Sequence, residues 1–191
     1  MKKLSAYEEQ FLHGMILGGA QLYRPNFCKH HHLRMNDRDV FWLRYKMANL
    51  AFLFRGSELK QEGKTCRVWS CSHPILSVMH NRFYGRKCRT ASTEVLDVLT
   101  DVGLSVWAVD SGVCYGRNGT SFYLSVGKFD TESQDNIWMY FNDVLDMPCT
   151  LHGNRLKFSR LGWRELVRVI EPKLPLFALR KLHLSSDGSA R

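Results

Sequence analysis

The feature that most constrains the fold of this chain is a weak internal repeat. Each half of the sequence predicts a helix, a hairpin, a second helix, a second hairpin and a closing helix. The amino acids of the two halves differ, but a shared order of five secondary-structure elements is improbable by chance. The sequence therefore predicts an α+β protein of two similar halves, because 191 residues suffice for two halves around one core.

The first half is expected to span residues 1–84 and the second residues 100–184, with a basic linker over 85–99 and a polar tail over 185–191. In the first half the expected elements are a helix over Tyr7–Leu17, a polar and aromatic stretch over Gln21–Met35 with a turn at Pro25-Asn26, a helix over Asp37–Phe54, a hairpin over Leu59–Cys71 and a helix over Pro74–Phe83. In the second half they are a helix from the N-cap Thr100 through Val109, a hairpin over Tyr115–Val126 turning at Arg117-Asn118-Gly119, a helix over Asp130–Leu145, a hairpin over Cys149–Ser159 and a helix over Gly162–Glu171 that Pro172 ends.

The charge of the chain favours a polyanionic partner, most simply nucleic acid. Lys and Arg number 27 against 18 Asp and Glu, so the formal net charge is +9 and the pI about 9.4. A basic protein without such a partner is the alternative. Hydrophobic residues make up 45% of the chain, which is enough for a packed core.

Cysteine and histidine spacing predicts neither disulfides nor a metal centre. None of the six Cys forms a CxxC pair, and no Cys or His spacing matches a zinc module. The thiols are expected to be free, as in a reducing compartment. The run His30-His31-His32 is expected in a strand, where three neighbours cannot face one ion. The chain shows no signal peptide and no apolar run long enough to span a membrane.

Two stretches about ninety residues apart carry a family resemblance. FLHGMILGGA (Phe11–Ala20) and LSVWAVDSG (Leu104–Gly112) each open one half, and Ile170–Pro175 with Lys181 follows near the end. Together they resemble the LAGLIDADG homing endonucleases, in particular single-chain members with two motifs, over Glu8–Leu182. The resemblance implies a pseudo-two-fold fold, with two motif helices packed along the axis and two saddle-shaped antiparallel sheets. The small residues that would let the two motif helices approach each other are Gly14, Gly18, Ser105 and Ala108.

The resemblance also implies that the metal-binding acids of both motifs are missing. In active relatives each motif helix ends in an acid that holds a divalent cation against the scissile phosphate. Those positions are Gly19 and Ser111 in this chain, with Asp110 adjacent to the second. We therefore expect no catalytic residue, no metal site and no cofactor; Mg²⁺ would be needed only if Asp110 supported cleavage.

Basic and aromatic residues are expected to bind nucleic acid through the outer faces of the sheets. Alternation along residues 154–160 places Leu156 and Phe158 inward and Arg155 and Lys157 outward. The expected binding residues are Lys29, Arg34, Arg67, Arg86, Lys87, Arg89, Arg117, Tyr123, Lys128, Arg155, Lys157 and Lys181, and Tyr23 and Tyr123 are the candidates for base stacking. A solvated outer face is the alternative for any one of these cations.

These expectations together predict a non-catalytic nucleic-acid-binding protein on a nuclease scaffold. RNA is favoured over DNA, because relatives without nuclease function are mainly intron maturases. A structural protein of an organellar ribosome or other ribonucleoprotein, with protein neighbours and no membrane, is the other form of this prediction. An organellar matrix, with the mitochondrion favoured, is the expected location. The alternatives are a divergent double-strand DNA endonuclease that uses Asp110 and a DNA-binding regulator.

Overall fold

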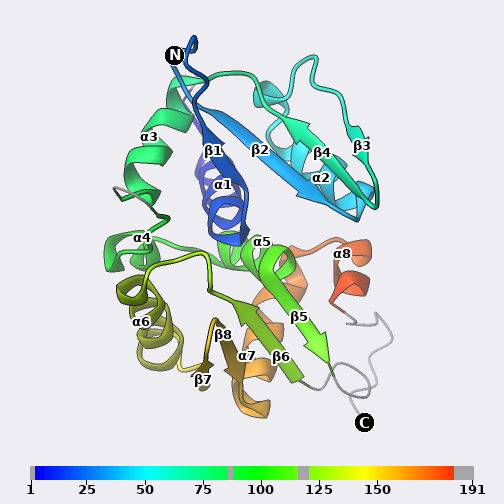
Figure 1. Cartoon of the computed structure of the whole chain (residues 1–191). Coiled ribbons are helices and arrows are strands. Elements are labelled where there is room, and N and C mark those ends of the chain that lie inside the picture. The colour runs from blue at the N-terminus through cyan, green and yellow to red at the C-terminus, as the bar shows by residue number, and fades with distance from the viewer. Residues whose placement is uncertain (1–2, 86–87, 116–120, 183–191) are drawn as a thin grey trace.

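The computed structural model describes residues 3–85, 88–115 and 121–182, and it divides into two halves with the same element order (Figure 1). The first half contains α1 Ala6–Gly18, β1 Gln21–Tyr23, β2 His32–Asp37, α2 Val40–Asn49, the 3₁₀ turn η1 Ala51–Leu53, β3 Lys60–Glu62, β4 Thr65–Trp69 and α3 Pro74–Phe83. After α4 Thr93–Asp97, the second half contains α5 Asp101–Ser111, β5 Gly112–Tyr115, β6 Ser121–Ser125, α6 Thr131–Met139, the π-helical turn η3 Tyr140–Val144, β7 Cys149–His152, β8 Arg155–Phe158, α7 Arg160–Ile170, the 3₁₀ turn η4 Glu171–Lys173 and α8 Leu176–Lys181.

Each half builds one antiparallel four-stranded sheet, and the two sheets have equivalent strand orders. The orders are β1-β2-β4-β3 and β5-β6-β8-β7. The predicted α+β fold with two antiparallel sheets is therefore confirmed, and the matching orders are the structural form of the internal repeat. The turn predicted at residues 117–119 and the tail over 185–191 lie outside the described residues.

Every described strand with alternating burial turns its apolar residues toward helices. Leu33 and Met35 are buried on β2, and Leu156 and Phe158 are buried on β8. Because side chains of a strand alternate between its faces, polar neighbours such as Lys157 stand on the opposite, outer face. This alternation gives each sheet one face toward the core and one outer face.

The two motif helices α1 and α5 pack against each other near the centre of the molecule (Figure 1). Ser5 and Glu8 form a capping box that begins α1: the Ser5 hydroxyl accepts from the Glu8 amide at 3.1 Å, and the Glu8 carboxylate accepts from the Ser5 amide at 2.8 Å. Gly14 makes the close contact between the helices, since a β-carbon there would collide with the carbonyl oxygen of Gly103. The contact is therefore backbone against backbone.

Several details differ from the sequence-based expectations. The expected linker contains the short helix α4, and a further helix, α8, follows the expected closing helix. Only His32 of the histidine run lies in a strand, because the run ends the loop that leads into β2. Ser105 is buried, and its hydroxyl donates within α5 to the carbonyl oxygen of Asp101 at 2.6 Å; its expected place between the helices stays a prediction. Gly103, which was not singled out, lies against Gly14 at the contact between the helices.

Helix α8 joins the second half to the first. Its Phe177 ring lies 5.6 Å from the ring of Tyr45 and 6.4 Å from that of Trp42, both on α2. An ion pair of 2.6 Å between Lys181 and Asp37 adds a polar contact. The six cysteines are all free. In the described part of the chain, no helix has the length and apolar character needed to cross a membrane.

Candidate nucleic-acid interface

The outer face of the first sheet carries a small group of aromatic and basic side chains. Tyr23 on β1 and Trp69 on β4 meet edge to face, with their ring centroids 5.9 Å apart. Arg34, which lies on β2 between them, places its guanidinium carbon 5.3 Å from the centre of the Trp69 ring. Both rings are partly exposed, at 51% for Tyr23 and 37% for Trp69. Exposed rings next to cations can stack on bases while the cations contact phosphates.

The outer face of the second sheet repeats this chemistry with different residues. Tyr115 on β5 stacks on Tyr123 on β6, with ring centroids 4.4 Å apart and planes 16° apart. Tyr123 pairs with Lys157 of β8 in the sheet register, and Ser125 pairs with Arg155. This face therefore presents stacked rings beside two exposed cations.

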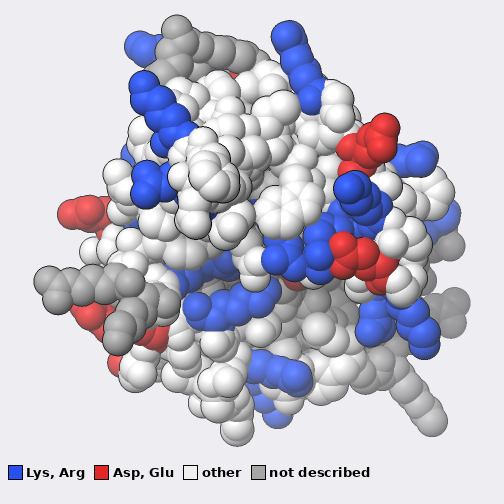
Figure 2. All heavy atoms as spheres, turned by 45° about the horizontal axis from the view of Figure 1, so that its top comes forward, with Lys and Arg blue, Asp and Glu red and all other residues white. Residues whose placement is uncertain are grey.

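Basic side chains are prominent on one face of the molecule. Figure 2 shows Lys and Arg side chains across the middle of this face, with fewer Asp and Glu side chains among them. A surface of this kind attracts a polyanion at long range, and the attraction weakens as salt is added.

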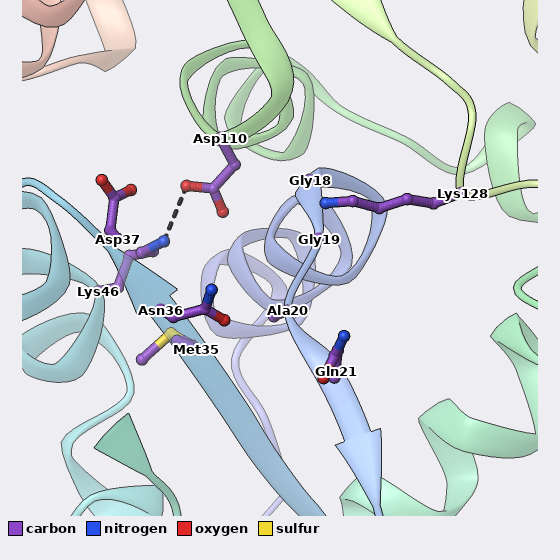
Figure 3. A pocket seen from close by; sticks show the side chains of 10 residues that line it. All are labelled: Gly18, Gly19, Ala20, Gln21, Met35, Asn36, Asp37, Lys46, Asp110 and Lys128. Atoms are coloured by element: carbon purple, nitrogen blue, oxygen red, sulfur yellow. Dashed lines mark hydrogen bonds and ion pairs between the residues drawn. The ribbon is translucent and has the colours of Figure 1, made fainter. Parts of the chain in front are cut away.

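A pocket of about 240 Å³ lies at the ends of the two motif helices. Its lining comes from α1, the start of β1, the end of β2, α2, α5 and the segment after β6 (Figure 3). The lining residues are Gly18, Gly19, Ala20, Gln21, Met35, Asn36, Asp37, Lys46, Asp110 and Lys128. The pocket is thus built from both halves around the pseudo-two-fold axis.

Asp110 is bound on one side of this pocket by two residues of α2. Its Oδ1 atom accepts a hydrogen bond from Lys46 Nζ at 2.8 Å and from Trp42 Nε1 at 2.5 Å. The side chains of Lys46 and Asp110 are only 4% and 6% exposed, so this is a buried ion pair between the halves. On the opposite side, the Cβ atom of Asp110 packs against Gly18, where a β-carbon would collide with it.

A second carboxylate, Asp37, is also occupied by a lysine. Lys181 Nζ lies 2.6 Å from Asp37 Oδ2, and the Asp39 amide donates to Oδ1 at 3.0 Å. Burial alone would raise the pKa of Asp37, but these hydrogen bonds and the charge of Lys181 outweigh it and lower the pKa. Asp37 is therefore a carboxylate anion that already has a cationic partner.

Gly19 and Ser111, the two positions where the family resemblance places metal-binding acids, make other contacts. Gly19 ends α1 with φ +128°, and a β-carbon at this residue would collide with Lys128 Nζ. Lys128 therefore places its ammonium beside the position where an acidic side chain would begin (Figure 3). Ser111 is buried and donates its hydroxyl to the carbonyl oxygen of Gly18 at 2.6 Å, so it ties α5 to α1.

In this structure the carboxylates of the pocket are not free to bind a divalent cation. Mg²⁺ requires free oxygen ligands, chiefly carboxylates and water. Both carboxylates of the pocket are bound by lysines, and Lys128 adds a repelling charge. Within residues 3–85, 88–115 and 121–182, no three His, Cys, Asp or Glu side chains gather as potential metal ligands.

The structure divides the basic residues expected to bind nucleic acid into several environments. Lys29, Arg155 and Lys157 are exposed, Arg34 lies on the first outer face, and Arg67 on the same sheet is paired with Glu62 at 2.7 Å. Lys128 is also exposed and lines the pocket, and Lys181 pairs with Asp37 beside it, whereas Arg89 is buried, with 6% of its surface exposed. The other three, Arg86, Lys87 and Arg117, lie outside the described residues.

Sequence reasoning missed four contributors to these sites: Trp69, Tyr115, Lys46 and Trp42. Alternation along β4 would have placed Trp69 on the outer face, whereas Gly112–Tyr115 shows no alternation that could place Tyr115. No local pattern links Lys46 and Trp42 to Asp110, because they are 64 and 68 residues away in the chain.

Comparison with known proteins agrees with this geometry. Solved structures similar to the chain include the homing endonuclease I-WcaI bound to its DNA recognition sequence, with a TM-score of 0.83, 16% identity and coverage of 95% of this chain and 88% of that one. The endonuclease I-DmoI in complex with DNA and Mn has a TM-score of 0.60 at 11% identity, with 86% and 96% coverage. The N-terminal LAGLIDADG domain of WhiA has a TM-score of 0.52 at 10% identity, with 94% and 89% coverage.

At these low sequence identities, the similarity to solved structures establishes the fold alone. The family is established by the match of the sequence to a family model. A search of curated proteins found no match. The model of the LAGLIDADG DNA endonuclease family matches residues 9–165, which is most of the chain. The motif helices, the paired sheets and this match together identify the chain as a member of the LAGLIDADG DNA endonuclease family.

Proposed function

We propose that this chain is a non-catalytic nucleic-acid-binding protein that prefers structured RNA to duplex DNA. The main support for a protein that does not cleave is the Lys128 ammonium, which lies beside Gly19, where the side chain of a metal-binding acid would begin. Ser111 supports it, since its hydroxyl serves a helix contact. A metal-dependent nuclease needs carboxylates free to hold the cation, and here lysines hold them.

The preference for RNA rests on the outer faces of the sheets. Each carries a pair of aromatic rings beside basic residues, Tyr23 with Trp69 and Tyr115 with Tyr123. Unpaired bases of folded RNA can be stacked on such rings, whereas the bases of duplex DNA are already stacked on one another. An RNA with loops or bulges is therefore the ligand that uses both the rings and the cations.

A DNA endonuclease is the second candidate, and one observation favours it. The carboxylates of Asp37 and Asp110 both line the central pocket. If nucleic acid displaced their lysines, the two carboxylates would be free to hold a cation. The solved I-WcaI and I-DmoI structures contain DNA, which agrees with this candidate as well.

A cleavage assay separates the two candidates. We expect the purified protein to leave plasmid DNA and a pool of random-sequence duplexes uncut in Mg²⁺ and in Mn²⁺, because no free carboxylate pair holds the metal. The matched variants are Asp110→Asn, which keeps an oxygen for Trp42 and Lys46, and Asp37→Asn. Metal-dependent cutting by the wild type that either variant abolishes would replace our proposal with the endonuclease.

A binding assay tests the preference for RNA. Tyr123→Ala is expected to weaken binding of an RNA hairpin with an unpaired loop by about 1–3 kcal/mol, because it removes a stacking surface. The same change should have little effect on duplex DNA of equal length. Arg155→Gln is the control, since loss of a phosphate contact should weaken both ligands and lower each salt slope by about 0.7–0.9. Equal loss for both ligands in Tyr123→Ala would remove the argument for RNA.

A further inference from the structure

A thiol and an imidazole meet in the segment that joins β1 to β2. The Cys28 amide donates to the carbonyl oxygen of Pro25 at 3.0 Å and closes a turn, and the Cys28 sulfur lies 3.4 Å from His32 Nε2. The other ring nitrogen, His32 Nδ1, lies 2.8 Å from the carbonyl oxygen of Ser70. Cys28 and His32 thus form a dyad that a carbonyl group extends, and the proposed function gives this dyad no role.

The Ser70 carbonyl fixes which nitrogen of His32 carries the proton. A carbonyl oxygen only accepts hydrogen bonds, so Nδ1 must be the donor, and in the neutral ring Nε2 then has a free lone pair. Nε2 therefore accepts a hydrogen bond from the Cys28 thiol. A nucleophile that faces a base, with the base oriented by a third group, is the arrangement that activates thiols in enzymes.

The loop around this dyad is fastened to the segment between β4 and α3. The His31 amide donates to the Ser77 hydroxyl at 3.2 Å, and the His73 amide donates to the carbonyl oxygen of His31 at 3.1 Å. Burial and the neighbouring His80 lower the pKa of His31 to about 4, so this ring is neutral at pH 7. The contacts of His31 therefore persist at neutral pH and hold the dyad in position.

The other five cysteines lack a nitrogen base of this kind among the described residues. Three thiols donate to oxygen atoms, which are weaker bases than imidazole: Cys66, Cys71 and Cys88. In the remaining two, burial raises the pKa, to about 12 in Cys114 and to about 11 in Cys149. Cys28 is partly exposed and has its own base, so it is expected to be the most nucleophilic of the six.

The dyad lies on the outer face of the first sheet. His32 pairs with Tyr23 in the register of β1 and β2, and directly opposed residues share a face. Arg34 is two residues further along β2, so it lies on the same face. The exposed Lys29 follows Cys28 in the chain. A group attached to Cys28 would therefore stand beside the ring and the cations that we assign to nucleic acid.

We propose that Cys28 is a modification site that forms a mixed disulfide with small anionic disulfides of the glutathione type, and that this modification weakens nucleic-acid binding by the first sheet. The second half of this inference rests on the proposed function. An anionic reagent is favoured because Lys29 is adjacent and the chain carries a net charge of +9. Once attached, the same negative charge repels a phosphate backbone, and the added bulk covers Tyr23.

The exchange needs no component beyond the protein and the disulfide. His32 Nε2 takes the thiol proton, the Cys28 sulfur attacks one sulfur of the reagent, and the S–S bond of the reagent breaks. The departing thiolate takes up the proton, so Cys28 is oxidised, the reagent is reduced and one small thiol is released. Excess small thiol reverses the reaction, so the modified fraction follows the thiol–disulfide balance around the protein.

The first experiment follows this exchange without nucleic acid. Wild-type protein is mixed with glutathione disulfide at pH 7, and the mixed disulfide at each cysteine is quantified by mass spectrometry. Cys28 should react at least about tenfold faster than the exposed Cys71, because an unassisted thiol is mostly protonated at this pH. The difference should close above about pH 9, where thiols ionise without a base. Equal rates for the two thiols at pH 7 would overturn the proposal.

His32→Asn is the matched variant for the base. The asparagine amide can still donate toward the Ser70 carbonyl from the position of Nδ1, but it offers the thiol no basic nitrogen. Cys28 in this variant should react no faster than Cys71, while the thermal midpoint should change by only about 1–2 °C. Fast exchange at Cys28 in His32→Asn would show that His32 is not its base. The comparison of the two thiols in the wild type does not depend on this variant.

The second experiment measures the affinity of the modified protein for an RNA hairpin. Protein with glutathione on Cys28 should bind about tenfold more weakly than reduced protein, which is the loss expected when one base can no longer stack on Tyr23. Cys28→Ser should bind as the reduced wild type does, before and after treatment with glutathione disulfide. Undiminished affinity of the modified protein would refute the effect on binding. If the wild type binds neither RNA nor DNA, the proposed function fails, and the exchange rates alone decide whether Cys28 is activated.

Discussion

Lys46→Met is expected to lower the free energy of unfolding by about 3–5 kcal/mol, since it leaves the Asp110 carboxylate buried without its cationic partner. The pair is 4% and 6% exposed, so water cannot replace the lost ammonium without opening the contact between α2 and α5. Trp42 Nε1 would remain as a donor to this carboxylate, but a neutral hydrogen bond cannot offset a buried charge.

Urea unfolding followed by circular dichroism would measure this loss, and a double variant provides the control. Lys46→Met/Asp110→Asn removes both charges and keeps an oxygen for Trp42, so it should recover most of the lost stability. Lys60→Met, on the exposed strand β3, should change stability by about 0.5 kcal/mol or less. A double variant as unstable as Lys46→Met would show that the ion pair is not the source of the loss.

Gly14→Ala is expected to produce the other large effect, a destabilisation of about 3 kcal/mol. A single methyl group at this position meets the carbonyl oxygen of Gly103 and comes within 2.8 Å of the Val106 Cβ atom. Both obstacles are close to the backbone of α5, so no flexible side chain can move aside. The two motif helices must therefore separate, and contacts along their whole shared length weaken.

The sign of this effect is informative because alanine is the better helix former. In an exposed helix interior, the same substitution would stabilise by about 1 kcal/mol. The measurement is the urea midpoint with an unchanged slope, compared with Ala6→Val in the exposed first turn of α1. If Gly14→Ala were as stable as the wild type or more so, the close contact between α1 and α5 would be refuted.

Much of the fold could be predicted from local sequence, since most elements carry their own signals. The range expected for α3 has the same bounds as the helix, because Pro74 marks its first turn and apolar residues follow at helical spacing. The short helices α4 and α8 were missed, since five or six residues hold too few positions for a periodicity to appear. Their stability comes from packing, as in the contact of Phe177 with α2.

The candidate site was predictable in part only. The absence of acids at Gly19 and Ser111 is visible in the sequence, whereas the position of Lys128 beside Gly19 is not. Arg89 was expected on a basic linker among the residues that bind nucleic acid, but the fold buries it against Tyr84 and Phe129. Lys46 gives no sign in its own helix that its partner is Asp110 in the other half. Such pairings arise only when distant segments meet in the folded protein.

The backbone conformation of Gly19 disfavours an acidic residue at this position. Its φ of +128° is readily adopted by glycine and strained for aspartate, so the first mutation would carry a cost before any benefit. The new carboxylate would then pair with the Lys128 ammonium, so it would not be free to bind a divalent cation. A single substitution at Gly19 is therefore not expected to produce a free carboxylate; a changed turn and a changed lysine would be needed together.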